Sequence, residues 1–185
     1  MSNQWVIGCT HFDDPTVIPF RKNRFKTLED MQEKICSSWN AKVDDNDPVY
    51  ILGDFALKRI DYWVRKLKGQ KILILGNHDK IIVHSGYFVS VEPMIYLRLP
   101  PKGTMEKPQE VFMFHYPCIS WENKQEGSVH LHAHSHGNLS TSLPGVPGPA
   151  RLDMSVDCWD EWPVPLETAI QKALEKPTIN PLIGM

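Results

Sequence analysis

The segment KILILGNHD, residues 71–79, gives the clearest indication of how this chain folds. Its first half is an almost unbroken apolar run, which is typical of a short strand buried on both faces of a sheet. Its second half is polar, since Asn77, His78 and Asp79 follow the run after a glycine. Ligand sites in open α/β sheets lie beyond the carboxyl ends of the strands. The segment therefore predicts a buried strand that carries three polar side chains to a site at its end.

The chain before this segment repeats a pattern of strand and helix. Apolar runs at residues 4–8 and 48–54 predict two further buried strands. Between the three strands, residues 27–40 and 60–69 each place apolar side chains on one helical stripe, and Thr27 is positioned to cap the first helix. Strands that alternate with helices predict parallel pairing with right-handed crossovers.

The chain after this segment is mostly strand-like. Short apolar runs follow one another with little helix between them, at residues 87–91, 94–99, 110–115, 128–134 and 151–157. A further helix is predicted at residues 165–175, with Pro165 in its first turn. Two sheets packed face to face accommodate both halves of the chain. We therefore predict the α/β (α+β) class, in the form of a four-layer αββα sandwich of two mixed sheets flanked by helices.

The composition fits a single globular domain that spans residues 1–185. The formal net charge is −2, which gives no electrostatic reason to expect nucleic acid as a partner. The sequence has no apolar run long enough to cross a membrane and no secretory signal at residues 1–12. The 4 cysteines are spread out without a CxxC pair, so free thiols in a reducing, cytoplasmic compartment are expected.

Polar side chains gather at the ends of five predicted strands. They are Cys9 and His11, Asp54, Asn77 with His78 and Asp79, His115, and His134 with His136. In VHLHAHSHG, residues 129–137, four histidines alternate with other residues, which is also compatible with one packed face of a strand. Imidazole is however the commonest metal ligand, and the other strand ends offer further ligands. This pattern predicts a metal centre.

Five short motifs occur in an order that resembles the calcineurin-like metallophosphoesterases, and in particular a compact bacterial and phage-type branch. They are CTH at 9–11, LGDF at 52–55, LGNHDK at 75–80, FHYP at 114–117 and AHSH at 133–136. The resemblance covers about residues 5–160, and GNHD after an apolar strand is its most specific element.

The resemblance implies roles for individual residues. His78 would protonate the leaving group as general acid, oriented by Asp79. Asp54 would bridge two metal ions, the first completed by Cys9, His11 and His136 and the second by Asn77, His115 and His134. Two divalent transition-metal ions are therefore expected as cofactors, and His, Asp and Asn ligands suit Mn, Fe or Zn better than Ca. His130 and His132 would lie in the strand itself, in a structural role or in support of the ligands.

Two positions depart from the family pattern. Ala133 replaces a glycine, which only limits the local backbone. Cys9 replaces an aspartate ligand, which leaves three interpretations open. The thiolate is a ligand that favours Zn or Fe, or Cys9 is a bystander beside a weakened first site, or a carboxylate from Asp13 or Asp14 takes its place.

The expected function is metal-dependent hydrolysis of a small phosphodiester or phosphomonoester. Two metal ions close together can activate a water and neutralise a phosphoryl group. The alternative is a degenerate member of the fold that serves as a binding or scaffold module. The loss of aspartate at position 9 favours the alternative, whereas retention of His78 opposes it. Arg24 could meet the substrate phosphate or pair with a surface carboxylate.

Overall fold

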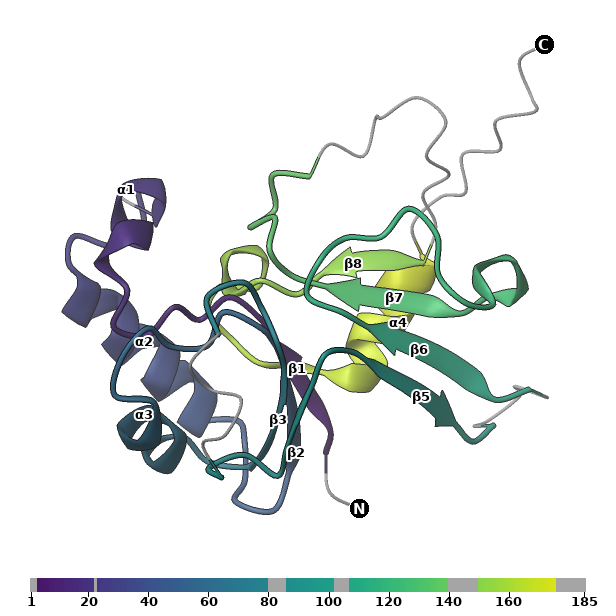
Figure 1. Ribbon diagram of the computed structural model, residues 1–185, viewed down its shortest axis with the longest axis horizontal. Helices are drawn as coiled ribbons and strands as arrows, with labels where there is room; N and C mark the ends of the chain where they lie inside the picture. Colours follow the sequence, from purple (N-terminus) through teal and green to yellow (C-terminus); the bar gives the residue numbers. More distant parts are fainter. Residues whose placement is uncertain (1–2, 22, 80–85, 102–106, 140–149, 176–185) are drawn as a thin grey trace, which may run out of the picture.

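Two β-sheets form the centre of the protein in a computed structural model that describes residues 3–21, 23–79, 86–101, 107–139 and 150–175 (Figure 1). The first sheet has the strand order β4-β3-β2-β1-β9. Strands β1 to β4 are parallel, and β9 runs antiparallel to β1. The strands are β1 (Trp5–Ile7), β2 (Pro48–Leu52), β3 (Gln70–Ile74), β4 (Ser90–Glu92) and β9 (Val164–Pro165).

The second sheet has the order β5-β6-β7-β8. Its strands are β5 (Ile95–Leu99), β6 (Gln109–Met113), β7 (Val129–His132) and β8 (Arg151–Asp153). Strand β5 is antiparallel to β6, while β6, β7 and β8 are parallel. Both sheets are therefore mixed, as predicted. Strand β7 ends at His132, so the histidine-rich segment is only partly a strand.

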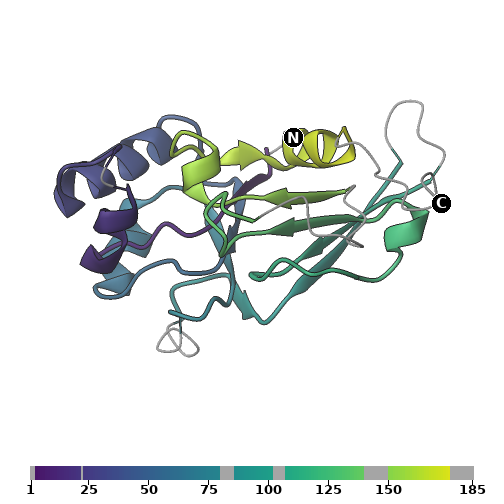
Figure 2. The same cartoon turned by 90° about the horizontal axis from the view of Figure 1, so that it is seen from above.

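The helices cover the sheets unevenly. Helices α1, α2 and α3 lie on the side of the first sheet away from the second sheet (Figures 1 and 2), whereas α4 contacts β1 and β9 as well as β7 and β8. The α-helices are α1 (Ile18–Arg21), α2 (Leu28–Asn40), α3 (Ile60–Lys66) and α4 (Leu166–Leu174). Short 3₁₀ turns are η1 (Pro15–Val17), η2 (Lys124–Glu126) and η3 (Val156–Cys158). None of the helices in the described ranges is long and apolar enough to cross a membrane.

The helix boundaries agree with the sequence at the start of α2 and differ elsewhere. Thr27 caps α2, because its side chain accepts a hydrogen bond of 3.1 Å from the Asp30 amide. Helix α3 ends before the predicted residue 69, because Leu67 is already extended (φ −94°, ψ 133°). Pro165 was predicted in the first turn of the last helix. This was wrong by one position, since Pro165 precedes α4 and pairs with Trp5 in the sheet.

Both faces of the first sheet are buried, which explains its unbroken apolar strands. Ile7, Ile51 and Leu73 face α2 and α3 in one core cluster. Their neighbours Val6 and Leu52 face the second sheet in another cluster, which also contains Ala169 and Ala173 of α4. Alternate residues of a strand point to opposite faces, so each strand contributes side chains to both core clusters. The predicted fold class, with two mixed sheets flanked by helices, is confirmed.

The carboxyl ends of β1, β2, β3, β6 and β7 meet at one edge of the sandwich. The Cys9 amide donates to the Gly53 carbonyl (3.0 Å), and the Ala133 amide donates to the His115 carbonyl (2.9 Å). The chains approach so closely that a Cβ at Gly53 would collide with the ring of His115, and one at Gly76 with the carboxylate of Asp54. Glycine is therefore required before Asp54 and before Asn77.

Candidate metal centre

A cavity of about 410 Å³ opens where these strand ends meet. The predicted site residues that line it are His11, Asp54, Asn77, His78, His134 and His136. Cys9, Asp79 and His115 are completely buried just behind the lining side chains. The structure thus brings together all nine residues that the sequence indicated, although the role of each stays a prediction.

Unusual backbone geometry is concentrated at the predicted ligands. Cys9 (φ 52°), His11 (φ 50°), Asp54 (φ 52°), His134 (φ 66°) and His136 (φ 48°) all adopt the left-handed region. This region is uncommon for residues other than glycine, and such strain persists only where the surrounding structure imposes it. Five such residues around one cavity indicate that the surrounding structure imposes an unfavourable backbone conformation in order to place these side chains.

One half of the centre is formed around His115. Its Nε2 atom lies 3.1 Å from Asn77 Oδ1, 3.2 Å from His134 Nδ1 and 3.4 Å from Asp54 Oδ2. Its Nδ1 atom lies 2.8 Å from the carbonyl oxygen of Leu52, to which it donates when the ring is neutral. The Nε2 lone pair then faces the acceptor oxygens of Asn77 and Asp54, and a cation between them would relieve their repulsion.

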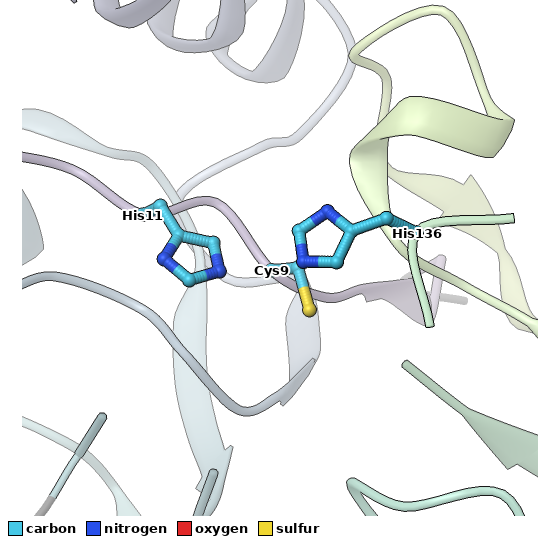
Figure 3. Close-up of side chains that lie close together, drawn as sticks. All are labelled: Cys9, His11 and His136. Atoms are coloured by element: carbon cyan, nitrogen blue, oxygen red, sulfur yellow. The ribbon is translucent and has the colours of Figure 1, made fainter. Parts of the chain in front are cut away.

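The other half contains Cys9, His11 and His136 (Figure 3), whose candidate ligand atoms all lie within 4.8 Å of one another. Cys9 and His11 come from the loop after β1, and His136 comes from the loop after β7. The sulfur of Cys9 is equally part of a second group with Asp54 and His115. The sulfur of Cys9, although grouped here with the first half, is therefore also close to His115 of the other half.

The Nε2 atom of His11 is buried and has no hydrogen-bond partner within the part of the chain that the structure describes. It lies 3.6 Å from Asp54 Oδ2. A buried polar atom is nearly always satisfied, and an exception calls for a missing ion or water. The residues present therefore fit a bound cation: His11 offers a free nitrogen, and its neighbours are soft and hard ligands of the kinds that transition metals accept.

Two carboxylates hold the histidines of the first half in place. Asp14 Oδ2 lies 3.0 Å from His11 Nδ1, and Asp157 Oδ2 lies 2.7 Å from His136 Nδ1. Arg21 in turn donates to both oxygens of Asp157 (2.7 Å each) and to the carbonyl of Cys9 (2.8 Å). A carboxylate behind a histidine orients the ring toward a metal and raises its basicity.

The supporting residues Asp157 and Arg21 were missed in the sequence. Asp157 belongs to a strand-like run, where a carboxylate has no recognisable spacing to a histidine. Arg21 lies 136 positions before Asp157. Asp14 was considered only as a substitute ligand. The signal that could have found it is its distance of three positions from His11.

Burial controls the protonation of the centre. Burial lowers the pKa of His11 to about 4, so its imidazole is neutral near pH 7 and able to bind a cation. Burial also raises the pKa of the Cys9 thiol, with the charge of Asp54 adding to the effect. A thiolate at Cys9 therefore requires a cation beside it. Burial alone would raise the pKa of Asp157, but hydrogen bonds from His136 and Arg21 hold it well below its usual range.

Asp79 acts on the backbone of the site. Its carboxylate accepts hydrogen bonds from the amides of Asp54 (2.7 Å), Phe55 (2.9 Å) and Gly76 (2.8 Å). The amide of His78 donates to Asp54 Oδ1 (2.9 Å). Asp79 thereby fixes the loop that carries His78. Its expected role in orienting the His78 ring has no hydrogen bond to support it among the contacts that the structure describes.

The nearby aspartates do not replace the family's carboxylate at position 9. Asp13 is bound by the guanidinium of Arg59 (2.8 Å) and by the indole of Trp63 (2.9 Å). Asp14 is engaged with His11, as described above, and with Thr16. The amide of His134 donates to Cys9 Sγ at 3.2 Å, which keeps the sulfur within the centre. Two interpretations of Cys9 thus stay open: its thiolate is a ligand, or it does not bind the metal.

The remaining histidines of the segment contact backbone groups of the second sheet and its loops. His130 Nε2 accepts from the Cys118 amide (3.1 Å), and its Nδ1 lies 3.2 Å from the Phe112 carbonyl. His132 Nδ1 lies 2.9 Å from the Ala133 carbonyl. These contacts are compatible with a structural role or with support of the ligands, and the role of both histidines stays a prediction. Arg24 pairs with Glu161 (2.6 Å), which supports its interpretation as an ion-pair partner.

The fold and site define an α/β sandwich whose strand ends present a histidine-rich set of candidate metal ligands. The chain matches the calcineurin-like phosphoesterase family over residues 3–141 and therefore belongs to that family. The resemblance noted in the sequence is confirmed.

Several related proteins cover most of the chain. An uncharacterized protein of Methanocaldococcus jannaschii is 27% identical over 188 residues, spanning 95% of this chain and 93% of its own length. The gene 66 protein of Mycobacterium phage L5 is 24% identical over 169 residues, spanning 77% and 81%. A crystal structure of a protein of unknown function from Aquifex aeolicus has a TM-score of 0.66 at 24% identity and covers 93% of this chain and 99% of its own. This likeness supports the fold.

Proposed function

We propose that this protein hydrolyses a small phosphodiester or phosphomonoester with two divalent transition-metal ions. The observation that carries the proposal is the position of one oxygen atom. Asp54 Oδ2 lies 3.6 Å from His11 Nε2 and 3.4 Å from His115 Nε2, so a single carboxylate serves both halves of the centre. One oxygen between two imidazole nitrogens is the arrangement expected of a carboxylate that bridges two cations.

Each half would hold one cation. Cys9, His11 and His136 would hold the first, and Asn77, His115 and His134 would hold the second, with Asp54 shared. When bound, Mn, Fe or Zn would supply Lewis acidity that activates water and neutralises charge on the phosphoryl group. The donor set of nitrogen, oxygen and sulfur atoms suits these metals.

The protein's own groups would supply orientation and a proton. His78 lines the cavity beside Asp54 and His11, and its ring centroid lies 5.3 Å from that of His11. From this position it would donate a proton to the oxygen of the leaving group as general acid. Asp79 would hold the loop that carries His78 in a fixed position through its three hydrogen bonds with backbone amides.

A second candidate function is a binding or scaffold module with a weakened first metal site. The raised pKa of the Cys9 thiol favours this alternative, because a neutral thiol is a poor ligand. The buried Nε2 of His11, which has no hydrogen-bond partner among the described residues, opposes it, because a scaffold without a cation leaves that atom unsatisfied.

The proposal is tested with bis-p-nitrophenyl phosphate and p-nitrophenyl phosphate as substrates. Purified protein should hydrolyse at least one of them, chelation should abolish the reaction, and Mn, Fe or Zn should restore it. His134→Ala should strip metal from the protein, whereas His132→Ala should retain it, because His132 lies outside the ligand set. Protein that binds divalent metal but hydrolyses neither ester would support the scaffold function.

A further inference from the structure

The segment from Asp14 to Arg21 is attached at both ends to the first half of the metal centre. At its start, Asp14 holds the ring of His11. At its end, Arg21 holds Asp157, the partner of His136, and its Nη2 lies 3.4 Å from His136 Nδ1. Pro15 and Pro19 restrict the backbone between the two anchors. The segment therefore forms a wall of the cavity with a fixed position relative to the two histidines.

The wall contributes Asp14, Thr16, Val17, Phe20 and Arg21 to the cavity lining, and the polar side chains among them are bonded within the protein. Thr16, Val17 and Phe20 line the opening beside His11 and His136. The guanidinium of Arg21 lines it too, but its donors are directed at Asp157, at the Cys9 carbonyl and at the sulfur of Met31. The donors of Arg21 are thus used within the protein, so the wall offers little free charge with which to bind a ligand.

Phe20 is the most exposed of the large hydrophobic side chains in the described ranges, at 90%. It belongs to a helix of only four residues, and its neighbour Arg21 is buried at 3%. Arg21 and the core contact of Ile18 anchor this helix, and the side chain of Phe20 contributes little buried surface. A single exposed apolar side chain needs no explanation by itself, but this one is held at the mouth of a cavity that contains metal ligands.

We propose that Phe20 determines substrate preference by stacking against an aromatic ring next to the phosphate of the substrate. The substrate class would then be phosphate esters of nucleosides or of aryl alcohols. This inference rests on the proposed phosphoesterase function. The ring of Phe20 and the side chain of Val17 would cover the aromatic group while the phosphate lies among the histidines. Stacking of a base on an aromatic side chain changes affinity by roughly 5- to 150-fold.

The proposal is tested by calorimetry with ligands that differ in one group. Zn-loaded protein is titrated with phenylphosphonate and with propylphosphonate, which share a stable phosphorus–carbon bond. In parallel it is titrated with the phosphonate analogues of AMP and of ribose 5-phosphate, in which a methylene replaces the ester oxygen, so that this pair also resists hydrolysis and differs by the base. The wild type should bind the aromatic member of at least one pair at least about 5-fold more tightly. Preference in the AMP pair alone would assign a nucleobase, and preference in both pairs would assign aromatic rings in general.

Substitutions test whether Phe20 is the source of the preference for aromatic ligands. Phe20→Ala should bring the affinity ratio of each preferring pair close to one, whereas Phe20→Trp should retain it. Ile119→Ala removes another exposed hydrophobic side chain, 63% exposed and outside the cavity lining, and should leave the ratio unchanged.

Equal affinities within both pairs, or a preference that survives in Phe20→Ala, would overturn the inference and leave the phosphoesterase proposal intact. Failure of the Zn-loaded protein to bind any of the four ligands would also overturn the inference, and hydrolysis of bis-p-nitrophenyl phosphate by the same sample would then decide the proposed function separately.

Discussion

Asp157 Oδ2 lies 2.7 Å from Nδ1 of His136, and the same carboxylate accepts two hydrogen bonds from Arg21. The contact assigns the Nδ1 proton of a neutral His136 ring to Asp157, which leaves Nε2 with a lone pair for a cation. Asp157 thus decides which nitrogen of His136 can serve as a ligand. The same logic applies to Asp14 and His11 on the opposite side of the first half of the centre.

Asp157→Ala should weaken metal binding at the first site by about 10- to 100-fold, the usual effect of removing a carboxylate behind a ligating histidine. The second site should keep its affinity, because it does not contact Asp157. Competition with a chromogenic chelator measures both affinities. The matched control is Asp160→Ala, which removes an exposed carboxylate near Arg24 and should change neither. Unchanged affinity in Asp157→Ala would contradict this account of His136.

Substitution of Cys9 separates its two remaining interpretations. If the thiolate is a ligand, Cys9→Ala should lower the metal content by about one ion per chain. Cys9→Asp should retain both ions and shift the preference toward harder ions such as Mn. Elemental analysis of protein loaded with equal amounts of Mn and Zn gives both quantities. An unchanged metal content in Cys9→Ala, together with a gain in Cys9→Asp, would make Cys9 a bystander.

His78→Ala should lower the hydrolysis rate by roughly 10²–10⁴-fold for a substrate with an alkoxide leaving group. The loss should be smaller with p-nitrophenyl esters, because their leaving group departs without a proton. Steady-state rates on both substrates, compared at equal metal content, measure the difference. An equal loss on the two substrates would assign His78 to positioning of the phosphate and not to proton transfer.

Buried His130 should make stability fall at moderately acidic pH. Burial lowers its pKa in the folded protein to about 3, whereas in the unfolded chain it takes up a proton below about pH 6.5. Between these values the unfolded state binds one proton more, so the free energy of unfolding decreases as the pH falls. The contribution of His130 to the free energy of unfolding should therefore fall by about 2 kcal/mol between pH 7 and pH 5.

Urea unfolding of metal-free wild type and His130→Gln at the two pH values isolates this contribution. The variant should be less stable at pH 7 but should lose less stability on acidification. His11, whose pKa burial also lowers, is present in both proteins and cancels in the comparison. Parallel losses in the two proteins would show that His130 is not kept neutral by burial.

The sequence predicted features that depend on local patterns. Apolar runs without alternation predicted strands buried on both faces, and Ile7, Ile51 and Leu73 indeed pack on one side while their neighbours pack on the other. Thr27 predicted the start of α2 because its cap involves a residue only three positions away. The candidate ligands were predicted to lie together because the carboxyl ends of parallel strands meet at one edge, and the structure does bring them together.

Features that depend on distant contacts were not predictable. Asp157 and Arg21 meet across 136 positions, and no spacing rule links them. The early end of α3 follows from an extended Leu67, which the helical stripe does not reveal. The backbone function of Asp79 depends on amides that only the fold brings near, such as those of Asp54 and Phe55. Side-chain chemistry identified the candidate site, whereas its supporting contacts required the three-dimensional structure.

The most direct test of a shared two-cation centre is a titration of metal-free protein with Zn²⁺ in which bound metal and phosphodiester hydrolysis are followed in the same sample. The account predicts two bound ions per chain, with hydrolysis rising as the second ion binds, and a substantial loss of both binding steps in Asp54→Ala because Asp54 contacts both halves. Saturation at two ions without hydrolysis, or an Asp54→Ala variant that binds and turns over like the wild type, would contradict it.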